Sequence, residues 1–350
     1  MTTIGVIRDT APGERRVALV PADVGRLRGA GHEVVVETGA GAGAWHRDEA
    51  YAAAGARVAG RAQVYADSDI VLCLRPPDDL DALHSGQTLI GLLGPLDDPG
   101  APQRLAAAGV TALSLDRLPR TLSRAQAMDA LTSQANVAGY KAALLAADAY
   151  GGFLPMLVTA AGTTRPARVL VLGAGIAGLQ AIATARRLGA VVTGYDVRAA
   201  ARADIASTGA AVLTLDAPAA TGEGGYARRL TDEEAAEQRR ALDEAVAGFD
   251  IVITAAQVFG GRPPLLVTAS AIAKLRPGAV VVDVGGNVAD ASSPGVTIVR
   301  APDLAARVPE AASAAYSRNV CALLATLPID PADEVHAALL ISPVAEGVAS

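Results

Sequence analysis

Three glycines have the spacing of a phosphate-binding turn. Gly173, Gly175 and Gly178 come directly after the apolar run at 169–172 and before a helical pattern. In such a turn the first glycine permits a sharp change of direction, the second lets a pyrophosphate approach the backbone, and the third lets the helix pack against the strand. The helix N-terminus adds N–H groups and the positive end of the helix dipole. This spacing predicts binding of a dinucleotide.

A carboxylate follows at the distance that such a site needs. Asp196 ends the next apolar run, 18 residues after Gly178. There it would accept hydrogen bonds from the hydroxyls of the adenosine ribose and repel a 2′-phosphate. This favours NAD(H) over NADP(H), although an arginine such as Arg198 can accommodate that phosphate. An ordinary glycine-rich turn without a ligand is the alternative. Other residues near the glycine turn and the ends of the apolar runs are also expected to contact the cofactor: Ile176, Ala177, Val197 and Ala255.

The bulk composition disfavours several other classes of protein. The 350 residues carry a formal net charge of −6, and the basic residues do not cluster, so nucleic acid is not an expected partner. Cys73 and Cys321 are lone cysteines and the four histidines stand apart, so no metal is expected. No apolar run reaches the roughly 18 residues of a membrane span, and no secretory signal is visible. We therefore expect a cytoplasmic protein without a membrane span.

The elements that position the turn form two series. Short apolar runs alternate with helical patterns, and a long helical pattern at 124–150 separates the first series from the second. Such alternation predicts parallel sheets with helices on both faces. We expect an α/β fold of two Rossmann-like, doubly wound parallel-sheet domains, joined by long helices with a cleft between them. Residues 1–125 with about 310–350 would form a discontinuous N-terminal domain, and 126–309 the NAD(H)-binding Rossmann domain.

Several longer stretches resemble one family. PGERRVALVP (12–21) and GHEVVVETGAGAGA (31–44) are similar to the opening that transhydrogenases share with alanine dehydrogenases. RAQAMDALTSQANVAGYKA (124–142), PMLVTAAGT (155–163) and GEGGYARRL (222–230) resemble the transhydrogenases specifically. Over nearly its whole length the chain thus resembles the NAD(H)-binding domain I of the alpha subunit of proton-translocating nicotinamide nucleotide transhydrogenase.

The resemblance implies a set of residues around the nicotinamide ring. These would be Arg120, Gln126, Asp129 and Thr132, with Gln126 and Asp129 as the candidate catalytic residues. In a continuous helix Gln126, Asp129 and Thr132 would share one face, because they are three residues apart. The alternative for Asp129 is a solvated or capping carboxylate.

Three further positions depend on the same resemblance. Gly225 and Tyr226 stand in a glycine-rich stretch that would form a mobile loop and close over the nucleotide. A plain exposed tyrosine is the alternative for Tyr226. Arg16 would hold a substrate carboxylate in an alanine dehydrogenase, whereas in a transhydrogenase it would be a structural ion-pair partner.

The implied reaction is direct hydride transfer between NAD(H) on this chain and NADP(H) on a partner subunit, coupled to proton translocation by a membrane subunit. Transfer between two nicotinamides moves no proton to or from a substrate, so it needs no general acid or base. The protein must only bind and orient the cofactor. The family further implies a homodimer in the cytoplasm, peripheral to the membrane through its partner subunits.

Departures from the alanine dehydrogenase pattern disfavour that activity. Arg75 stands in place of a lysine, Gly94 in place of a histidine, and the loop at 282–287 lacks several residues, an aspartate among them. Oxidative deamination needs a group that moves protons at the amine carbon. The short loop also departs from the transhydrogenases. A stand-alone NAD-dependent dehydrogenase or imine reductase, and a non-catalytic NAD(H)-binding module, are therefore the alternatives.

Overall fold

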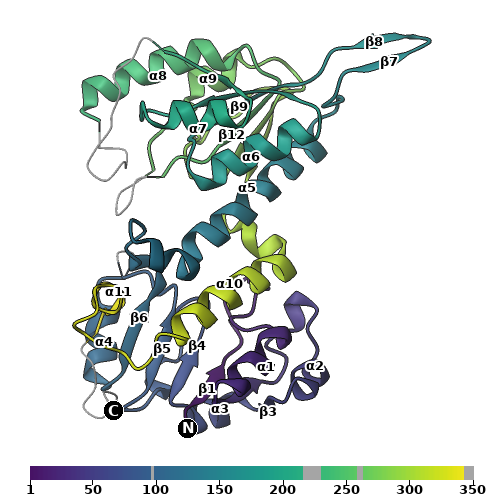
Figure 1. Cartoon of the computed structure of the whole chain (residues 1–350). Helices are drawn as coiled ribbons and strands as arrows, with labels where there is room; N and C mark the ends of the chain where they lie inside the picture. Colours follow the sequence, from purple (N-terminus) through teal and green to yellow (C-terminus); the bar gives the residue numbers. More distant parts are fainter. Residues whose placement is uncertain (96–97, 216–229, 258–262, 343–350) are drawn as a thin grey trace. The chain divides into compact units, whose positions relative to one another are not determined.

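The chain folds into two compact units (Figure 1). A computed structural model of the chain describes residues 1–95, 98–215, 230–257 and 263–342. One unit comprises residues 1–134 with 306–350, and the other comprises residues 135–305. Each contains a six-stranded sheet whose neighbouring strands run parallel. The predicted α/β fold with two parallel-sheet domains is confirmed.

The sheet of the first unit has the strand order β3-β2-β1-β4-β5-β6. Its strands are β1 (Thr3–Val6), β2 (Glu33–Glu37), β3 (Arg57–Ala59), β4 (Ile70–Leu72), β5 (Thr88–Gly91) and β6 (Thr111–Ser114). The α-helices of this unit are α1 (Pro21–Gly29), α2 (Asp48–Ala53), α3 (Arg61–Asp67), α4 (Ala101–Ala107), α10 (Pro309–Leu324) and α11 (Glu334–Leu339). Parallel strands covered on both faces are continuous apolar runs, and β4 is buried at every position.

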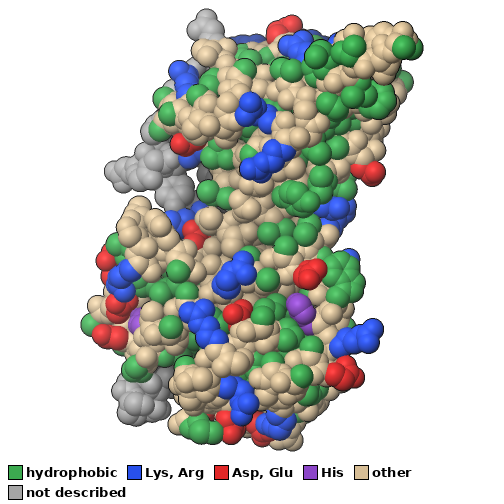
Figure 2. All heavy atoms as spheres, turned by 45° about the vertical axis from the view of Figure 1, so that its right-hand side comes forward, with side chains coloured by type: hydrophobic (Ala, Val, Ile, Leu, Met, Phe, Trp, Pro, Cys, Tyr) green, Lys and Arg blue, Asp and Glu red, His purple; other side chains and the backbone are tan. Residues whose placement is uncertain are grey.

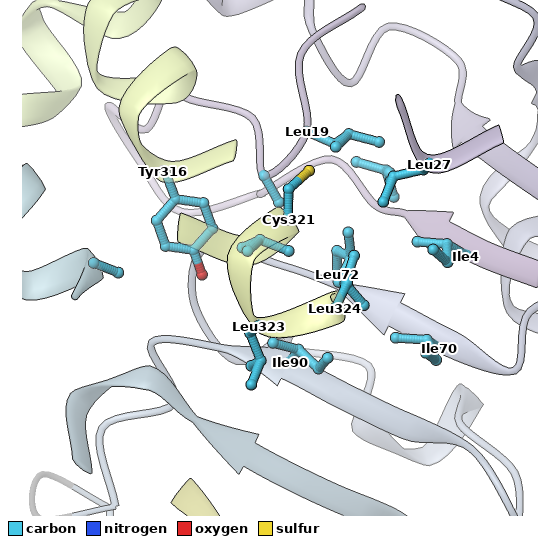
Figure 3. Close-up of a cluster of buried hydrophobic side chains, with 14 of the residues drawn as sticks. Ile4, Leu19, Leu27, Ile70, Leu72, Ile90, Tyr316, Cys321, Leu323 and Leu324 are labelled. Atoms are coloured by element: carbon cyan, nitrogen blue, oxygen red, sulfur yellow. The ribbon is translucent and has the colours of Figure 1, made fainter. Parts of the chain in front are cut away.

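The C-terminal part of the chain packs onto this first sheet through α10. Figure 3 shows Tyr316, Leu323 and Leu324 of α10 among core side chains that include Ile4 and Leu72 of the sheet. The Tyr316 hydroxyl donates to the carbonyl of Cys73 at 2.8 Å. The tail is therefore part of the first unit's core, although it follows the second unit in sequence.

The sheet of the second unit has the order β11-β10-β9-β12-β13-β14. Its strands are β9 (Arg168–Leu172), β10 (Val191–Tyr195), β11 (Ala211–Val212), β12 (Ile251–Thr254), β13 (Val280–Asp283) and β14 (Thr297–Arg300). The helices are α6 (Ile176–Arg187), α7 (Ala201–Ser207), α8 (Asp232–Val246) and α9 (Ala269–Lys274), with most of α5 (Ala130–Ala149). Two apolar clusters form the core of this unit, and alternate residues of β9 belong to each: Val169 and Val171 to one, Leu170 and Leu172 to the other.

A β-hairpin extends from the second unit, and no sequence pattern predicted it. It consists of β7 (Leu157–Thr159) and the antiparallel β8 (Gly162–Thr164), and Figure 1 shows it projecting away from the sheet. Its strands are mostly exposed. Because sequence patterns report burial, an exposed pair of three-residue strands gives little periodicity to detect.

The long helix expected over 124–150 is interrupted, which corrects the prediction. Residues Ser123–Met128 form the 3₁₀ helix η4, and α5 begins at Ala130. Between them Asp129 has φ −73° and ψ 85°, outside the helical region. The side chain of Asp129 accepts hydrogen bonds from Thr132, so it caps a new helix instead of continuing the old one. Among the described residues, the other short 3₁₀ helices are η1 (Ala42–Ala44), η2 (Leu80–Ala82), η3 (Leu115–Arg117) and η6 (Leu304–Arg307).

The surface chemistry is mixed. On the face in Figure 2, Lys and Arg side chains are dispersed among acidic and apolar ones. Within the described part of the chain no helix combines the length and apolar character that crossing a bilayer requires. Over those same residues, no group of three or more His, Cys, Asp or Glu side chains gathers as metal ligands would.

Candidate nucleotide-binding site

The turn between β9 and α6 requires glycine at two of its three predicted positions. Gly173 has φ +97°, and a Cβ built there would lie 2.7 Å from the backbone N of Ala256. A Cβ on Gly178 would lie 1.7 Å from the carbonyl oxygen of Gly173. These two glycines therefore permit the sharp turn and the close approach of α6 to the preceding strand.

Gly175 occupies the open side of the same turn. It is the residue before α6, and a Cβ built on it would have no atom within 4 Å. The next residue, Ile176, is 41% exposed although it is apolar. The N-terminus of the 12-residue helix α6 thus faces open space, where its N–H groups can receive a phosphate. This open cradle fits the pyrophosphate of a dinucleotide.

The backbone of α6 is anchored on its other side by α5. A Cβ on Gly139 of α5 would lie 2.0 Å from the carbonyl oxygen of Ala177. The two helices therefore pack with direct backbone contact in the first turn of α6. This contact fixes the position of the helix N-terminus that the predicted phosphate site uses.

Asp196 lies beside the glycine turn, as the sequence spacing predicted. It follows β10, and its Oδ2 accepts a hydrogen bond from the N–H of Ala174 at 2.8 Å. The guanidinium of Arg198 pairs with both carboxylate oxygens, from Nε and Nη2 at 2.9 Å each. Val197 is half-buried between these two residues. The predicted ribose-binding acid is thus next to the glycine turn and paired with an arginine.

The loops after β12 and β13 complete the carboxyl edge of the sheet. Ala255 follows β12, and its N–H donates to the carbonyl of Leu172 at 2.8 Å. Asp283 at the end of β13 accepts hydrogen bonds from the Thr254 hydroxyl at 2.8 Å and from the N–H groups of Gly286 and Asn287, both at 2.9 Å. The short loop that departs from both families is therefore a closed, hydrogen-bonded turn.

Asn287 is a structural residue that was not among those predicted. It is fully buried, and its side-chain amide donates to the carbonyls of Ala256 and Pro264 at 2.9 Å each. Its Oδ1 accepts from the N–H of Ala256 at 3.2 Å. No local pattern signals this role, because the backbone groups that its side chain binds are 23 and 31 residues away in the sequence.

The predicted nicotinamide residues belong to the first unit. Asp129 is buried, and it accepts hydrogen bonds from the N–H of Thr132 at 2.8 Å and from its hydroxyl at 2.7 Å. The Nε of Arg120 is 3.7 Å from Oδ2 of Asp129. Gln126 lies exposed in η4, before the helix begins. Arg120, Asp129 and Thr132 are thus in one cluster, whereas the prediction that Gln126, Asp129 and Thr132 share a helix face is wrong.

Arg16 is a buried ion-pair partner, as expected for a transhydrogenase. Its Nε and Nη2 donate to the two carboxylate oxygens of Glu14, at 2.8 and 2.5 Å, and its Nη1 donates to Gln134 at 2.8 Å. Burial favours the neutral form of Glu14, but the hydrogen bonds and charge of Arg16 outweigh it and lower the pKa of Glu14. The guanidinium of Arg16 is therefore paired with a carboxylate of the protein itself.

The structure also shows the surroundings of the two residues that stand where an alanine dehydrogenase has a lysine and a histidine. Arg75 lines a pocket of about 250 Å³ in the first unit, and its Nε is 3.6 Å from Glu14. Gly94 donates its N–H to Asp116 at 2.7 Å. Gly225 and Tyr226 of the predicted loop lie outside the described residues.

The second unit defines the class of protein. A parallel sheet, a glycine turn that opens onto a helix N-terminus and a carboxylate after the second strand are the features of an NAD(H)-binding α/β protein. The chain belongs to the alanine dehydrogenase/PNT family. The N-terminal domain of that family matches residues 5–138, and its C-terminal domain matches residues 142–347.

Individual relatives support the resemblance seen in the sequence. The chain is 40% identical over 339 residues to the first part of NAD(P) transhydrogenase subunit alpha of Rhodospirillum rubrum, covering 91% of this chain and 88% of that protein. It is 32% identical over 289 residues to alanine dehydrogenase of Mycolicibacterium smegmatis, covering 80% of this chain and 71% of the relative. Among solved structures, transhydrogenase from Sinorhizobium meliloti superimposes with a TM-score of 0.87 at 38% identity, over 97% of this chain and 98% of that one.

These comparisons confirm the predicted family and cofactor. The transhydrogenase relatives match more of the chain, at higher identity, than the alanine dehydrogenase does. The chain is a component of the NAD(P) transhydrogenase type, with the Rossmann-type fold of an oxidoreductase that binds NAD(H).

Proposed function

We propose that this chain is the NAD(H)-binding subunit of a nicotinamide nucleotide transhydrogenase. In the proposed reaction, hydride passes directly between NAD(H) on this chain and NADP(H) on a partner subunit. A membrane subunit couples that transfer to proton translocation. We further propose that the chain works as a homodimer, at the cytoplasmic face of the membrane through its partners. The similarity to transhydrogenase alpha subunits supports this assignment.

The observation that carries the proposal is the cluster of Arg120, Asp129 and Thr132. Asp129 uses its carboxylate as a helix cap, accepting two hydrogen bonds from Thr132. A carboxylate held in this way is suited to positioning rather than to taking a proton from a substrate. Because hydride transfer between two nicotinamides needs orientation and no proton carrier, the cluster suits that reaction.

The residues present fit the cofactor. The turn at Gly173, Gly175 and Gly178 would hold the pyrophosphate, and Asp196 would bind the adenosine ribose. NAD(H), when bound, supplies the hydride-transfer chemistry. Arg120, Gln126, Asp129 and Thr132 are proposed to orient the nicotinamide, and Gly225 and Tyr226 to close over the nucleotide. The remaining proposed contacts are Ile176, Ala177, Val197 and Ala255, and Arg198 stands at the ribose position, paired with Asp196.

The test combines a binding measurement with a hydride-transfer assay. The purified chain should bind NADH, measured by the change in NADH fluorescence, and should not oxidise it with small keto acids or imines. With the NADP(H)-binding subunit of a transhydrogenase added, NADH should reduce thio-NADP⁺, followed by absorbance. Turnover of a small substrate without a partner would favour a stand-alone dehydrogenase. NADH binding without transfer in either assay would favour a non-catalytic module.

A further inference from the structure

The carboxylate of Asp196 has no acceptor position left for a ribose. An ionised carboxylate accepts about four hydrogen bonds, and Asp196 already accepts four. Oδ1 receives the backbone N–H and the Nε of Arg198, both at 2.9 Å. Oδ2 receives the N–H of Ala174 at 2.8 Å and the Nη2 of Arg198 at 2.9 Å.

Two of these four donors cannot leave without local unfolding. The N–H of Ala174 belongs to the glycine turn, and the N–H of Arg198 belongs to the bend that follows β10. The two side-chain donors of Arg198 can leave together through a change of side-chain rotamer, which also breaks the longer contact from Nη2 to the carbonyl of Ala174 at 3.3 Å. The Arg198 side chain is 23% exposed and that of Asp196 only 8%, so solvent is open to the arginine rather than to the acid.

We propose that Arg198 competes with the adenosine ribose for Asp196, and so limits the affinity for NAD(H) while maintaining discrimination against NADP(H). The proposal rests on the nucleotide site described above. The two ribose hydroxyls would take the two acceptor positions that Arg198 vacates. At the carboxylate of Asp196, binding of NAD(H) thus exchanges one pair of hydrogen bonds for another, and the cost of breaking the internal contacts of Arg198 lowers the affinity.

The same exchange is more costly for NADP(H). A 2′-phosphate cannot donate hydrogen bonds to Asp196 and brings negative charge toward it. If Arg198 turned to the phosphate, the mostly buried carboxylate of Asp196 would keep its two backbone donors and gain only the 3′-hydroxyl, so it would lose its cationic partner and one hydrogen bond. A buried charge that loses its partner is strongly destabilising. The arginine near the ribose therefore does not make this an NADP(H) site, because its guanidinium is committed to the neighbouring carboxylate.

The test is Arg198→Met, which keeps the length of the side chain and removes its donors. NADH titrations followed by fluorescence should give binding about three- to tenfold tighter than wild type, the effect of one part-buried ion pair. NADPH should bind no more tightly than it does to wild type. Arg187→Met is the matched control, since Arg187 is exposed on α6. The same loss of charge there should leave both affinities unchanged.

A second pair of probes separates competition for the ribose from a general charge effect. The Arg198→Met variant should bind 5′-AMP more tightly than wild type does, and the gain should be smaller for 2′-deoxy-5′-AMP, which lacks one of the two hydroxyls. Arg198→Lys keeps the charge with a single donor group and should give intermediate NADH affinity. This conservative variant keeps the test decisive if Arg198→Met does not fold.

Two results would overturn the inference, and they can be told apart. If wild type binds NADH but Arg198→Met or Arg198→Lys binds it equally or more weakly, Arg198 does not compete with the ribose, and the proposed site stands. If wild type does not bind NADH at all, the proposed function itself fails and this inference fails with it.

Discussion

The side-chain amide of Asn287 donates to the backbone carbonyl of Ala256 at 2.9 Å, while its Oδ1 accepts the N–H of the same residue. This two-way contact joins the loop after β13 to the loop after β12. Because Asp283 binds the N–H of Asn287 in turn, the short loop is held by interactions of both side chains. The loop is therefore an ordered part of the carboxyl edge of the sheet, at which the nucleotide is proposed to bind.

Replacing Asn287 should destabilise the second unit. Asn287→Ala removes three hydrogen bonds and leaves the Ala256 and Pro264 backbone groups without these partners. We expect a loss of about 2–4 kcal/mol in the free energy of unfolding, measured by urea denaturation. Asn136→Ala is the control, since Asn136 is exposed on α5 and should cost less than about 0.5 kcal/mol. Equal losses in the two variants would contradict the structural role of Asn287.

Adding one methyl group at Gly178 should weaken nucleotide binding. The new Cβ would lie 1.7 Å from the carbonyl oxygen of Gly173, so α6 must move away from the phosphate turn. We expect NADH affinity to fall by about tenfold or more for Gly178→Ala, since positioning of the helix N-terminus is lost. The control is Gly25→Ala in α1, where a Cβ meets no atom within 4 Å. That variant should bind NADH normally and gain about 0.5–1 kcal/mol in stability.

Acid should weaken the second unit through Asp250. This carboxylate is buried, but hydrogen bonds from Arg165, the N–H of Arg168 and Arg276 outweigh that burial and lower its pKa to about 2. A lowered pKa means that the ionised group stabilises the fold above its unfolded pKa of 3.8, and that this contribution is lost as the pH falls toward about 2.

The variant that isolates this effect is Asp250→Asn. At pH 7 the free energy of unfolding of this variant should be about 1–2 kcal/mol lower than that of wild type, because its hydrogen bonds to the arginines lose the charge on the acceptor. The difference should shrink between pH 4 and pH 2, measured by urea denaturation at each pH. A difference in the free energy of unfolding that is constant over that range would show that the charge of Asp250 does not stabilise the fold.

The Asp129–Thr132 contact should matter more for hydride transfer than for stability. Asp129→Ala removes the cap of α5 and should cost about 1 kcal/mol in stability. In the assay with the NADP(H)-binding subunit, the same variant should lose about tenfold or more in rate, since the nicotinamide is no longer oriented. Thr132→Ser keeps both donors and should stay within about twofold of wild type. A loss in Thr132→Ser as large as that in Asp129→Ala would argue against this role.

The sequence predicted those parts of the fold that depend on local pattern. Strands such as β9 and β12 are apolar runs because both faces are buried, and the glycine turn follows from spacing alone. The break at Asp129 was missed because helical patterns continue on both sides of it, and only a side-chain cap separates them. The hairpin at 157–164 was missed because it is mostly exposed and carries no burial pattern.

The candidate site could be located from the sequence, but its internal contacts could not. The spacing between Gly178 and Asp196 indicated a ribose-binding acid, whereas the four donors to Asp196 depend on side-chain conformation. Asn287 likewise acts through residues 23 and 31 positions away, which no local motif encodes. Long-range hydrogen bonds of this kind appear only once the strands that carry them are placed.

The central claim is that hydride passes from NAD(H) on this chain to NADP(H) on a partner. The most direct measurement uses NADH with deuterium at both C4 positions, mixed with NADP⁺, the chain and the NADP(H)-binding subunit of a transhydrogenase, with mass spectrometry of the NADPH formed. The account predicts that NADPH carries one deuterium, without exchange with water, and that it forms only when both proteins are present. NADPH without the label, or no NADPH at all while NADH is bound, would contradict it.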